Sequence, residues 1–315
     1  MTTPQTIPVA SFADAKSSAA QRTFRRILIA ADFAGKPQAA LRLALRLGLS
    51  FQSHISLLHV FECSESAANG EAHVVQQELA SHRLNACLQE TKAAGLKAAL
   101  VEKDGHPVAA ILDTILSEKI DLVILGTHGF RGVERPGHGS TAEQVLRKSP
   151  CPVLTVGPHA AHIMEQKQPG GSVIFATDFN RASTPAISYA ASFSHLLNAP
   201  LRCLHVLPRM VESSQDDVAS GIIKVALHHV ANECKAAGQA TICDIGYGCD
   251  VSYAVIDYAR AHDAQLIVLG VRQTAMNANH LPAAIAYRII TESPCPVLTI
   301  AVQHNNDAKL SAACL

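Results

Sequence analysis

The chain has 315 residues, a length that favours two domains, and 48% of them are hydrophobic, which is enough for two buried cores. Lysine plus arginine equals aspartate plus glutamate at 26 each, and tryptophan is absent, so composition argues against nucleic acid or an anionic membrane as a partner. The apolar runs are too short to span a membrane, and nine cysteines without a CxxC pair fit a reducing cytoplasm.

Apolar runs and helical periods alternate along the first half of the chain. A polar stretch over residues 1–23 comes first; it lacks the basic start and apolar core of a signal peptide, and we expect a flexible tail there. The runs that follow are short, continuous and aliphatic, which predicts strands buried on both faces. We expect these strands at Ile27–Ala31, Ile55–Val60, Lys97–Val101, Leu122–Leu125 and Val153–Val156. Because helical periods separate them, the pattern predicts a parallel sheet covered by helices.

The segment after the first strand carries a candidate ligand-binding acid. Asp32 directly follows the run Ile27–Ala31, and ligands of open parallel sheets bind beyond the carboxyl ends of strands. Its carboxylate can accept hydrogen bonds from ribose hydroxyls or order a loop; an N-cap of the next helix is the alternative. The face of that helix expected to lie against the sheet consists of Leu41, Ala44, Leu45, Gly48 and Leu49.

A glycine-rich segment follows the fourth expected strand. In "GTHGFRGVERPGHGSTAEQVLR", two residues separate Gly126 from Gly129, nine more lead to Gly139, and Ser140 comes next. Glycine lets the backbone approach a ligand closely, and the helix that begins here offers unpaired N–H groups to an anion. Ser140 and Glu143 form a capping-box signature, so a glycine-rich turn that only caps the helix is the alternative.

The chain repeats itself in its second half. The phrase "SPCPVLTV" at Ser149–Val156 recurs as "SPCPVLTI" at Ser293–Ile300. Three further pairs keep the same order: Arg26–Phe33 with Ser172–Phe179, Leu57–Phe61 with Cys203–Leu207, and Ile120–Gly126 with Ala264–Gly270. A duplication predicts two homologous domains, over residues 24–158 and 172–303, with a linker at 159–171 and a tail at 304–315. Since prolines suit the beginning of edge strands, we expect both phrases at sheet edges, with Cys151 and Cys295 as small buried side chains.

The second half keeps the strands but not the glycine pattern. Asp178, Val206 and Gly270 are retained. Gln273 stands where the second glycine is expected, Ala283 and Ala284 replace the Gly-Ser pair, and Tyr287 replaces Glu143. The comparison predicts one competent anion site, in the first half.

These residues resemble the universal stress protein family over nearly the whole chain, as a tandem two-domain member. The spacing Gly126-x2-Gly129-x9-Gly139-Ser140 matches the ATP-binding pattern of that family, and "GSTAEQVLRKSPCPVLTV" is similar to its C-terminal signature. The resemblance implies two Rossmann-like α/β domains, each a five-stranded parallel sheet of order 3-2-1-4-5 with helices on both faces, and an internal pseudo-dimer through the last strands. It implies ATP as the ligand, with Mg²⁺ left open. The implied roles are Asp32 and Val60 at the adenosine, Leu125 and Gly126 at the end of strand four, and Gly129, Gly139, Ser140 and Thr141 around ribose and phosphates.

Other functions have weaker support in the sequence. His229 and Glu233 have helical i,i+4 spacing, but no further ligand accompanies them, so we expect no specific metal site. No nucleophile and base are arranged for catalysis, so we expect no enzyme. The resemblance implies a cytoplasmic stress-response regulator that acts through an unidentified signalling partner. A slow ATP hydrolase, a scaffold that binds no nucleotide, and a homodimer of whole chains are left open.

Overall fold

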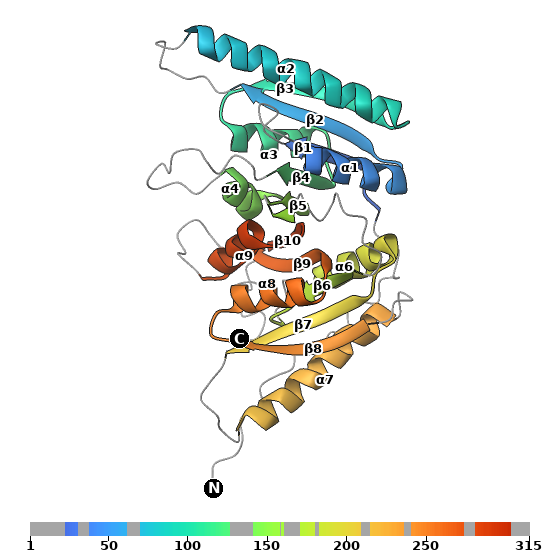
Figure 1. Ribbon diagram of the computed structural model, residues 1–315, viewed down its shortest axis with the longest axis vertical. Coiled ribbons are helices and arrows are strands. Elements are labelled where there is room, and N and C mark those ends of the chain that lie inside the picture. The colour runs from blue at the N-terminus through green and yellow to red at the C-terminus, as the bar shows by residue number, and fades with distance from the viewer. Residues whose placement is uncertain are drawn as a thin grey trace, which may run out of the picture.

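The computed structural model describes residues 23–30, 38–61, 70–126, 141–157, 159–160, 171–179, 183–208, 215–235, 241–273 and 281–303. The elements of the first half are β1 (Arg26–Ala30), α1 (Gln38–Phe51), β2 (His54–Phe61), α2 (Gly70–Ala93), β3 (Lys97–Asp104), α3 (Pro107–Ser117), β4 (Leu122–Gly126), α4 (Thr141–Lys148) and β5 (Val153–Val156). Those of the second half are β6 (Ser172–Ala176), α6 (Thr184–Leu197), β7 (Leu201–Pro208), α7 (Gln215–Lys235), β8 (Thr241–Gly248), α8 (Val251–Ala261), β9 (Ala264–Gln273), α9 (Leu281–Glu292) and β10 (Val297–Gln303). Figure 1 shows them in one elongated molecule, with α2 near one end and α7 near the other.

All these strands form one sheet of ten, in the order β3-β2-β1-β4-β5-β10-β9-β6-β7-β8. Within each half, neighbouring strands are parallel and follow the order 3-2-1-4-5 in that half's own count. The predicted fold class is therefore confirmed. Strand order reverses between β1 and β4 in the first half, and this is the position where open α/β sheets bind ligands.

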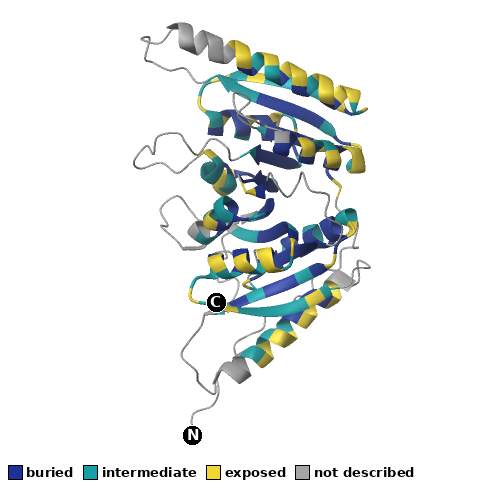
Figure 2. Cartoon of the chain, in the orientation of Figure 1, coloured by how far each residue is buried: buried dark blue, intermediate teal, exposed yellow. Residues whose placement is uncertain are grey.

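Helices cover both faces of the sheet. On one face, α1, α2, α6 and α7 bury apolar side chains in a core that is continuous through both halves. On the other face, α3 and α4 pack on one cluster, α8 and α9 on another, and Leu146 of α4 contacts both. Figure 2 shows the buried central strands between helices whose exposed residues point outward. No helix in the described part of the chain is long and apolar enough to cross a membrane.

The strand predictions hold for the centre of the sheet and fail at its edge. β3 extends to Asp104, beyond the expected end at Val101, and its residues are half-buried or exposed, with none of them buried. The expectation of burial on both faces is wrong for this strand, because it lies at the end of the sheet. Its charged residues Glu102 and Lys103 suit that position, since charge discourages an edge strand from pairing with other chains.

The apolar face predicted for α1 is correct at its centre and wrong at its C-terminal end. Leu41 and Ala44 are buried, but Leu49 is 54% exposed. Leu43 and Leu47 are buried in its place. Two positions along a helix correspond to a rotation of about 200°, so Leu49 and Leu47 lie on nearly opposite sides.

The two halves meet through their last strands. β5 and β10 run antiparallel, with Leu154 opposite Leu298, Thr155 opposite Val297 and Val153 opposite Thr299. Thr155 Oγ1 donates a hydrogen bond to the carbonyl of Val297 at 3.0 Å, and Thr299 Oγ1 donates one to the carbonyl of Val153 at 3.1 Å. The same bond therefore forms in both directions, as a local two-fold axis through the leucine pair requires. The predicted contact between the repeated phrases is confirmed.

The repeated phrase builds the same turn in both halves. The hydroxyl of Ser149 accepts the N–H of Cys151 at 3.3 Å and donates to its carbonyl at 2.8 Å. Ser293 and Cys295 form the same pair of bonds at 3.2 and 2.8 Å. The prolines of the phrase lack an N–H, so they fit the entrance of the strand, where the ladder needs no donor from them.

A cluster of aromatic rings joins the halves on the face covered by α1 and α6. The ring of Phe24, which precedes β1, lies 5.5 Å from that of Phe51 at the end of α1. It lies 5.8 Å from Tyr189 and 5.9 Å from Phe193, both on α6. The first half therefore packs directly on a helix of the second, in addition to the pairing of β5 with β10.

Candidate functional site

The carboxyl ends of β1 and β4 lie side by side at the switch point of the first half. In their parallel register, Ala30 is opposite Leu125, so the chain leaves both strands at the same edge of the sheet. Asp32 comes two residues after Ala30 in the sequence, and Gly126 directly follows Leu125. The two segments that the sequence singles out therefore start from neighbouring strand ends.

Four of the eight candidate site residues belong to the described part of the chain. Val60 is half-buried at the end of β2, and Gly126, the last residue of β4, lies opposite Val156. Thr141 is the exposed first residue of α4. Leu125 is 3% exposed and packs in the core beneath α3 and α4, so only its backbone is available to a ligand. The other four, Asp32, Gly129, Gly139 and Ser140, lie outside the described residues, and their roles stay predictions.

The helix α4 begins at the same edge of the sheet, because it connects two parallel strands. Glu143 in its first turn forms an ion pair with Arg147 in its last, at 2.7 Å. This arrangement of charge is favourable for the helix dipole. Val145 is fully buried and holds the helix on the core. The predicted bond between Glu143 and Ser140 involves a residue outside the described part.

The equivalent edge of the second half is occupied by strand pairing. From the third strand onward, equivalent residues of the halves differ by 144 in number, as Gly126 and Gly270 do. β9 continues past Gly270 to Gln273, and β10 pairs with it up to Gln303. The backbone after Gly270 is therefore part of the sheet and does not turn around a ligand there.

The helix of the second half includes the residues that replace the Gly-Ser pair. α9 begins at Leu281, four residues before residue 285, the counterpart of Thr141. Ala283 and Ala284 therefore lie inside a helix. Alanine favours a helix by about 1 kcal/mol over glycine, so Ala283 suits this position.

The strand end equivalent to Asp32 is held by contacts within the second half. The carbonyl of Thr177 lies 2.7 Å from Nδ1 of His205, and the His205 ring stacks on Phe179 at 4.6 Å. Asp178, the counterpart of Asp32, is exposed and accepts a hydrogen bond from Ser183 Oγ at 3.0 Å. The contacts of His205 within the second half give this side chain a structural role.

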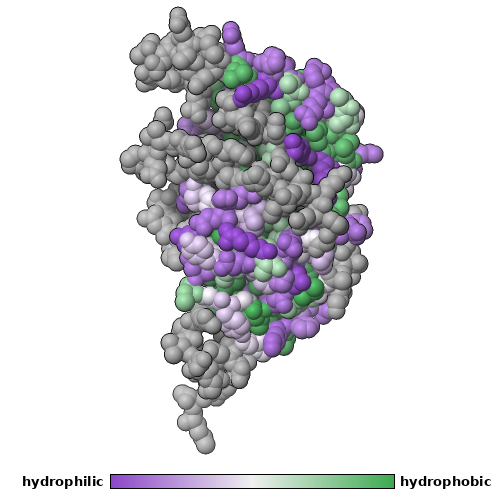
Figure 3. Space-filling view, in the orientation of Figure 1, coloured by the Kyte–Doolittle hydropathy of each residue, from purple (hydrophilic) through white to green (hydrophobic). Residues whose placement is uncertain are grey.

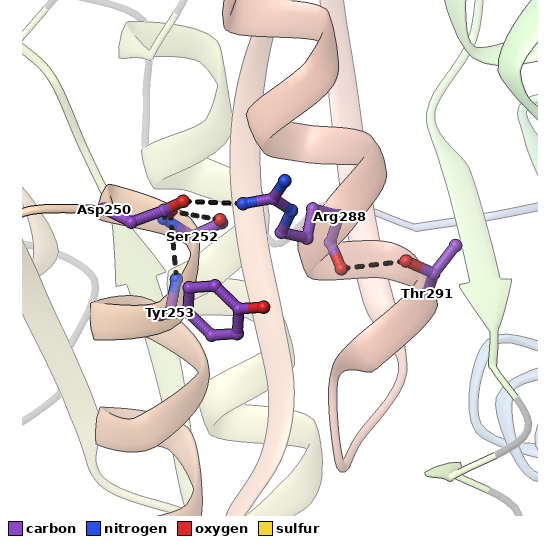
Figure 4. A network of polar contacts seen from close by, with 5 residues as sticks. All are labelled: Asp250, Ser252, Tyr253, Arg288 and Thr291. Carbon is purple, nitrogen blue, oxygen red and sulfur yellow. Dashed lines mark hydrogen bonds and ion pairs between the residues drawn. The ribbon is translucent and has the colours of Figure 1, made fainter.

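A polar network that the sequence analysis missed joins α8 to α9 (Figure 4). Asp250 caps α8: its Oδ1 accepts the N–H of Ser252 at 2.8 Å and that of Tyr253 at 3.4 Å. Its Oδ2 lies 2.6 Å from Nη1 of Arg288, and this guanidinium lies 5.4 Å from the centre of the Tyr253 ring. The hydrogen bond from the Ser252 hydroxyl lowers the pKa of Asp250, with smaller contributions from the backbone N–H groups and Arg288.

An alignment of the halves shows only that the two charged residues of this network are not shared. Asp250 and Arg288 correspond to His106 and Gln144 in the first half, two residues that form no ion pair with each other. His106 is itself the N-cap of α3, with Nδ1 accepting the N–H of Val108 at 3.3 Å. The starts of α3 and α8 are thus capped by side chains of different charge.

The cysteines of the repeated phrase have little thiolate character. Burial raises the pKa of Cys151 to about 11 and that of Cys295 to about 12. Cys295 is 1% exposed and Cys151 half-buried, so the prediction of small buried side chains is confirmed for Cys295 and partly for Cys151. Among the described residues, no group of three or more His, Cys, Asp or Glu is placed to hold a metal ion.

Comparison with known proteins agrees with this architecture. The model of the universal stress protein family matches the chain twice, at residues 23–157 and 171–301, so the chain belongs to that family, with two domains in tandem. A universal stress protein of Methanocaldococcus jannaschii is 27% identical over 142 residues, which are 43% of this chain and 84% of the relative. One from Bacillus subtilis is 26% identical over 151 residues, 42% of this chain and 99% of the relative.

A solved structure shows the same fold over the whole tandem length. The crystal structure of a universal stress protein from Archaeoglobus fulgidus DSM 4304 has a TM-score of 0.67 and 19% identity. The alignment covers 91% of this chain and 100% of that one.

Proposed function

We propose that the first half of the chain binds one ATP and that the second half does not. Asp32 and Val60 serve the adenosine, and Gly126, Gly129, Gly139, Ser140 and Thr141 serve ribose and phosphates. Leu125 contributes its backbone. In this proposal the protein is a cytoplasmic nucleotide-binding regulator of a stress response, and the nucleotide controls its contact with a signalling partner.

The observation that carries the proposal is that protein backbone occupies the carboxyl edge of the second half, where the first half has a glycine-rich sequence. That sequence starts at Gly126, at the switch point, and reaches Thr141, the exposed first residue of α4. Backbone N–H groups of such a segment and of a helix N-terminus suit a phosphate chain. In the second half the corresponding backbone belongs to β9 and to the first turn of α9.

The two halves provide matched variants for the test. Gly129→Gln introduces the residue that the second half has at Gln273, and its side chain would block close approach of the phosphates. Calorimetry should give one ATP per chain for the wild type and none for Gly129→Gln. The control Gln273→Gly should leave the stoichiometry at one, because β9 and α9 still occupy the second edge. Two equivalent sites, or full binding by Gly129→Gln, would contradict the proposal.

We further propose that the nucleotide is bound without turnover. The described residues around the edge supply backbone and hydroxyl groups rather than a nucleophile paired with a base. The measurement is release of phosphate from ATP by purified protein. Turnover at ordinary enzyme rates, about 1–1000 per second, that disappears in Gly129→Gln would contradict this part of the proposal.

A further inference from the structure

The two outer edges of the sheet differ in charge. β3 is the strand at one end of the sheet and β8 the strand at the other, and no described strand pairs with the outer side of β8. Four of the eight residues of β3 are charged, whereas β8 has one charged residue among its eight, Asp244. Because charge discourages an edge strand from pairing with other chains, β3 is protected in a way that β8 is not.

The charge of Asp244 is compensated within its own half. Its Oδ2 accepts a hydrogen bond from the Tyr258 hydroxyl and lies 3.2 Å from Nη1 of Arg202. Tyr258 belongs to α8, so this carboxylate points to the face of the sheet that α8 covers. It is committed to partners in its own chain and gives the outer edge of β8 little protection.

Apolar side chains gather at the same end of the molecule. Ile242 and Tyr247 of β8 are exposed, as are Ile222 and Val225 of α7, and these four are half of the eight large apolar side chains exposed in the described part of the chain. The hydroxyl of Ser220 on α7 lies 3.0 Å from that of Tyr247, so α7 and β8 share one surface. In Figure 3, hydrophobic residues are visible over the end of the molecule where Figure 1 places β8 and α7. Such a concentration marks an interaction surface.

The centre of the molecule shows how this kind of edge is covered. β5 and β10 are each the edge strand of their own half, and each follows a helix, α4 or α9. They pair antiparallel across a local two-fold axis, and both helices fit on one face of the joined sheet, where Leu146 of α4 packs on the clusters of both halves. β8 is likewise an edge strand that follows a helix, α7. The same arrangement therefore has room for a second β8 beside the first, with both α7 helices on one face.

We propose that β8 pairs antiparallel with β8 of a second copy of the chain, so that two chains form a dimer with one continuous sheet. A dimer about a two-fold axis uses the same surface of both copies, so the edge must be compatible with itself. The edge of β8 meets this condition, because it has no charge free to repel its copy. The mixed charges of β3 make that edge the poorer partner. This inference does not depend on nucleotide binding.

The charge of Asp244 also selects the register of the pairing. A two-fold axis across an antiparallel pair places residues of the same face opposite each other, as it does at the contact between β5 and β10. An axis through Asp244 would set two carboxylates opposite each other, which is unfavourable. An axis through Ile245 sets this side chain opposite its own copy and Cys243 opposite Tyr247 of the second copy. In this register Ile242–Gly248 is paired throughout.

The first test is the mass of the full chain in solution, measured by analytical ultracentrifugation. Wild type should have the mass of two chains, and Tyr247→Lys the mass of one, because lysine at an edge strand opposes pairing. Leu116→Lys, at an exposed position of α3, is the matched control and should remain a dimer. Thermal unfolding checks that Tyr247→Lys is folded; if it is not, Ile242→Lys takes its place.

Three results of this experiment would overturn the proposal. One is a wild type that stays a single chain up to about 100 µM. Another is a dimer that persists in both lysine variants of β8. The third is an open-ended series of larger assemblies, which would indicate a contact between unlike surfaces.

The second test is a disulfide that only the proposed register allows. Residue 241 lies opposite residue 249 of the second copy, at a Cα distance of about 5 Å, and Cys249 is exposed. Oxidation of Thr241→Cys should therefore give a covalent dimer on non-reducing electrophoresis. Within one chain the two positions are about 27 Å apart along the strand, too far for a disulfide.

A matched variant shows which cysteine reacts. Thr241→Cys combined with Cys249→Ser should remain a single chain under the same oxidation, and wild type should do so as well, because Cys249 is far from its own copy in this register. A covalent dimer that forms equally well without Cys249, or none in Thr241→Cys, would overturn the proposed pairing.

Discussion

Two regions of the molecule have diverged to different degrees. One is the contact between β5 and β10, and the other is the pair of carboxyl edges. At the contact, equivalent threonines donate equivalent hydrogen bonds at 3.0 and 3.1 Å, and equivalent serines close the same turn. At the carboxyl edges, the glycine-rich sequence of the first half is not kept in the second, and the residues that cap α3 and α8 differ. Residues at a two-fold contact pack against their own counterparts, so a change on one side affects the other. The two carboxyl edges lie apart in the sheet, and each can change alone.

This difference suggests why a duplicated chain can keep one site and lose the other. The second half still supplies β10, which covers the edge of β5, and α6, which packs on Phe24. Those contacts preserve its fold whether or not it binds a ligand. Its own carboxyl edge is stabilised by protein groups, among them the pairing of β9 with β10 and the Asp250–Arg288 pair.

The largest expected effect comes from a charge placed at the contact between the halves. Leu154 and Leu298 are fully buried and lie opposite each other. Leu154→Asp and Leu298→Asp should each destabilise the protein by about 4 kcal/mol or more, because a carboxylate is buried without a partner. Denaturant unfolding measures this free energy. Leu116→Asp, at a position that is 69% exposed, is the control and should have little effect. A large difference in unfolding free energy between Leu154→Asp and Leu298→Asp would show that the packing at the contact is less symmetric than its hydrogen bonds are.

A smaller effect is expected when one of the threonine bonds is removed. Thr155→Val and Thr299→Val keep the shape of the side chain but lose the hydroxyl. Each should cost about 1 kcal/mol in the free energy of unfolding, and the two costs should agree, because each removes one buried bond to a carbonyl. The double variant tests coupling across the pair. If one variant lost about 1 kcal/mol of unfolding free energy and the other lost almost none, the two hydrogen bonds would not be equivalent.

The smallest effect is expected at the cap of α8, and it depends on pH. The folded-state pKa of Asp250 is lowered, chiefly by the Ser252 hydroxyl, so its charge stabilises the fold above the unfolded pKa of about 3.9. This stabilisation is lost as the pH falls through the folded pKa. Asp250→Asn should therefore lower the Tm by a few degrees at most at pH 7, and the difference from wild type should shrink below pH 4. Asp257→Asn, in an exposed pair with Arg260, is the control. A Tm difference between Asp250→Asn and wild type that stays constant with pH would contradict the assignment of this stabilisation to the charge of Asp250.

Much of the architecture was predictable because it depends on local patterns. Short aliphatic runs separated by helical periods predict parallel strands, and the repeat of Ser149–Val156 at Ser293–Ile300 predicts the duplication. The serine, the prolines and the aliphatic residues of that phrase act within a few positions of one another, so the sequence carries their whole hydrogen-bond pattern. The spacing of Gly126, Gly129, Gly139 and Ser140 likewise predicts a ligand site, and the structure describes Gly126 at the switch point.

Only the tertiary structure decided which residues face which partners. Leu49 fits a helical apolar pattern but is exposed, because the sheet lies under the side of α1 that contains Leu47. The extension of β9 needs β10 beside it, and no pattern within residues 264–273 shows that neighbour. His106 and Asp250 are ordinary capping residues in sequence. The packing of α3 on α4 and of α8 on α9 brings them to the carboxyl edges, because side-chain neighbours there come from segments far apart in the chain.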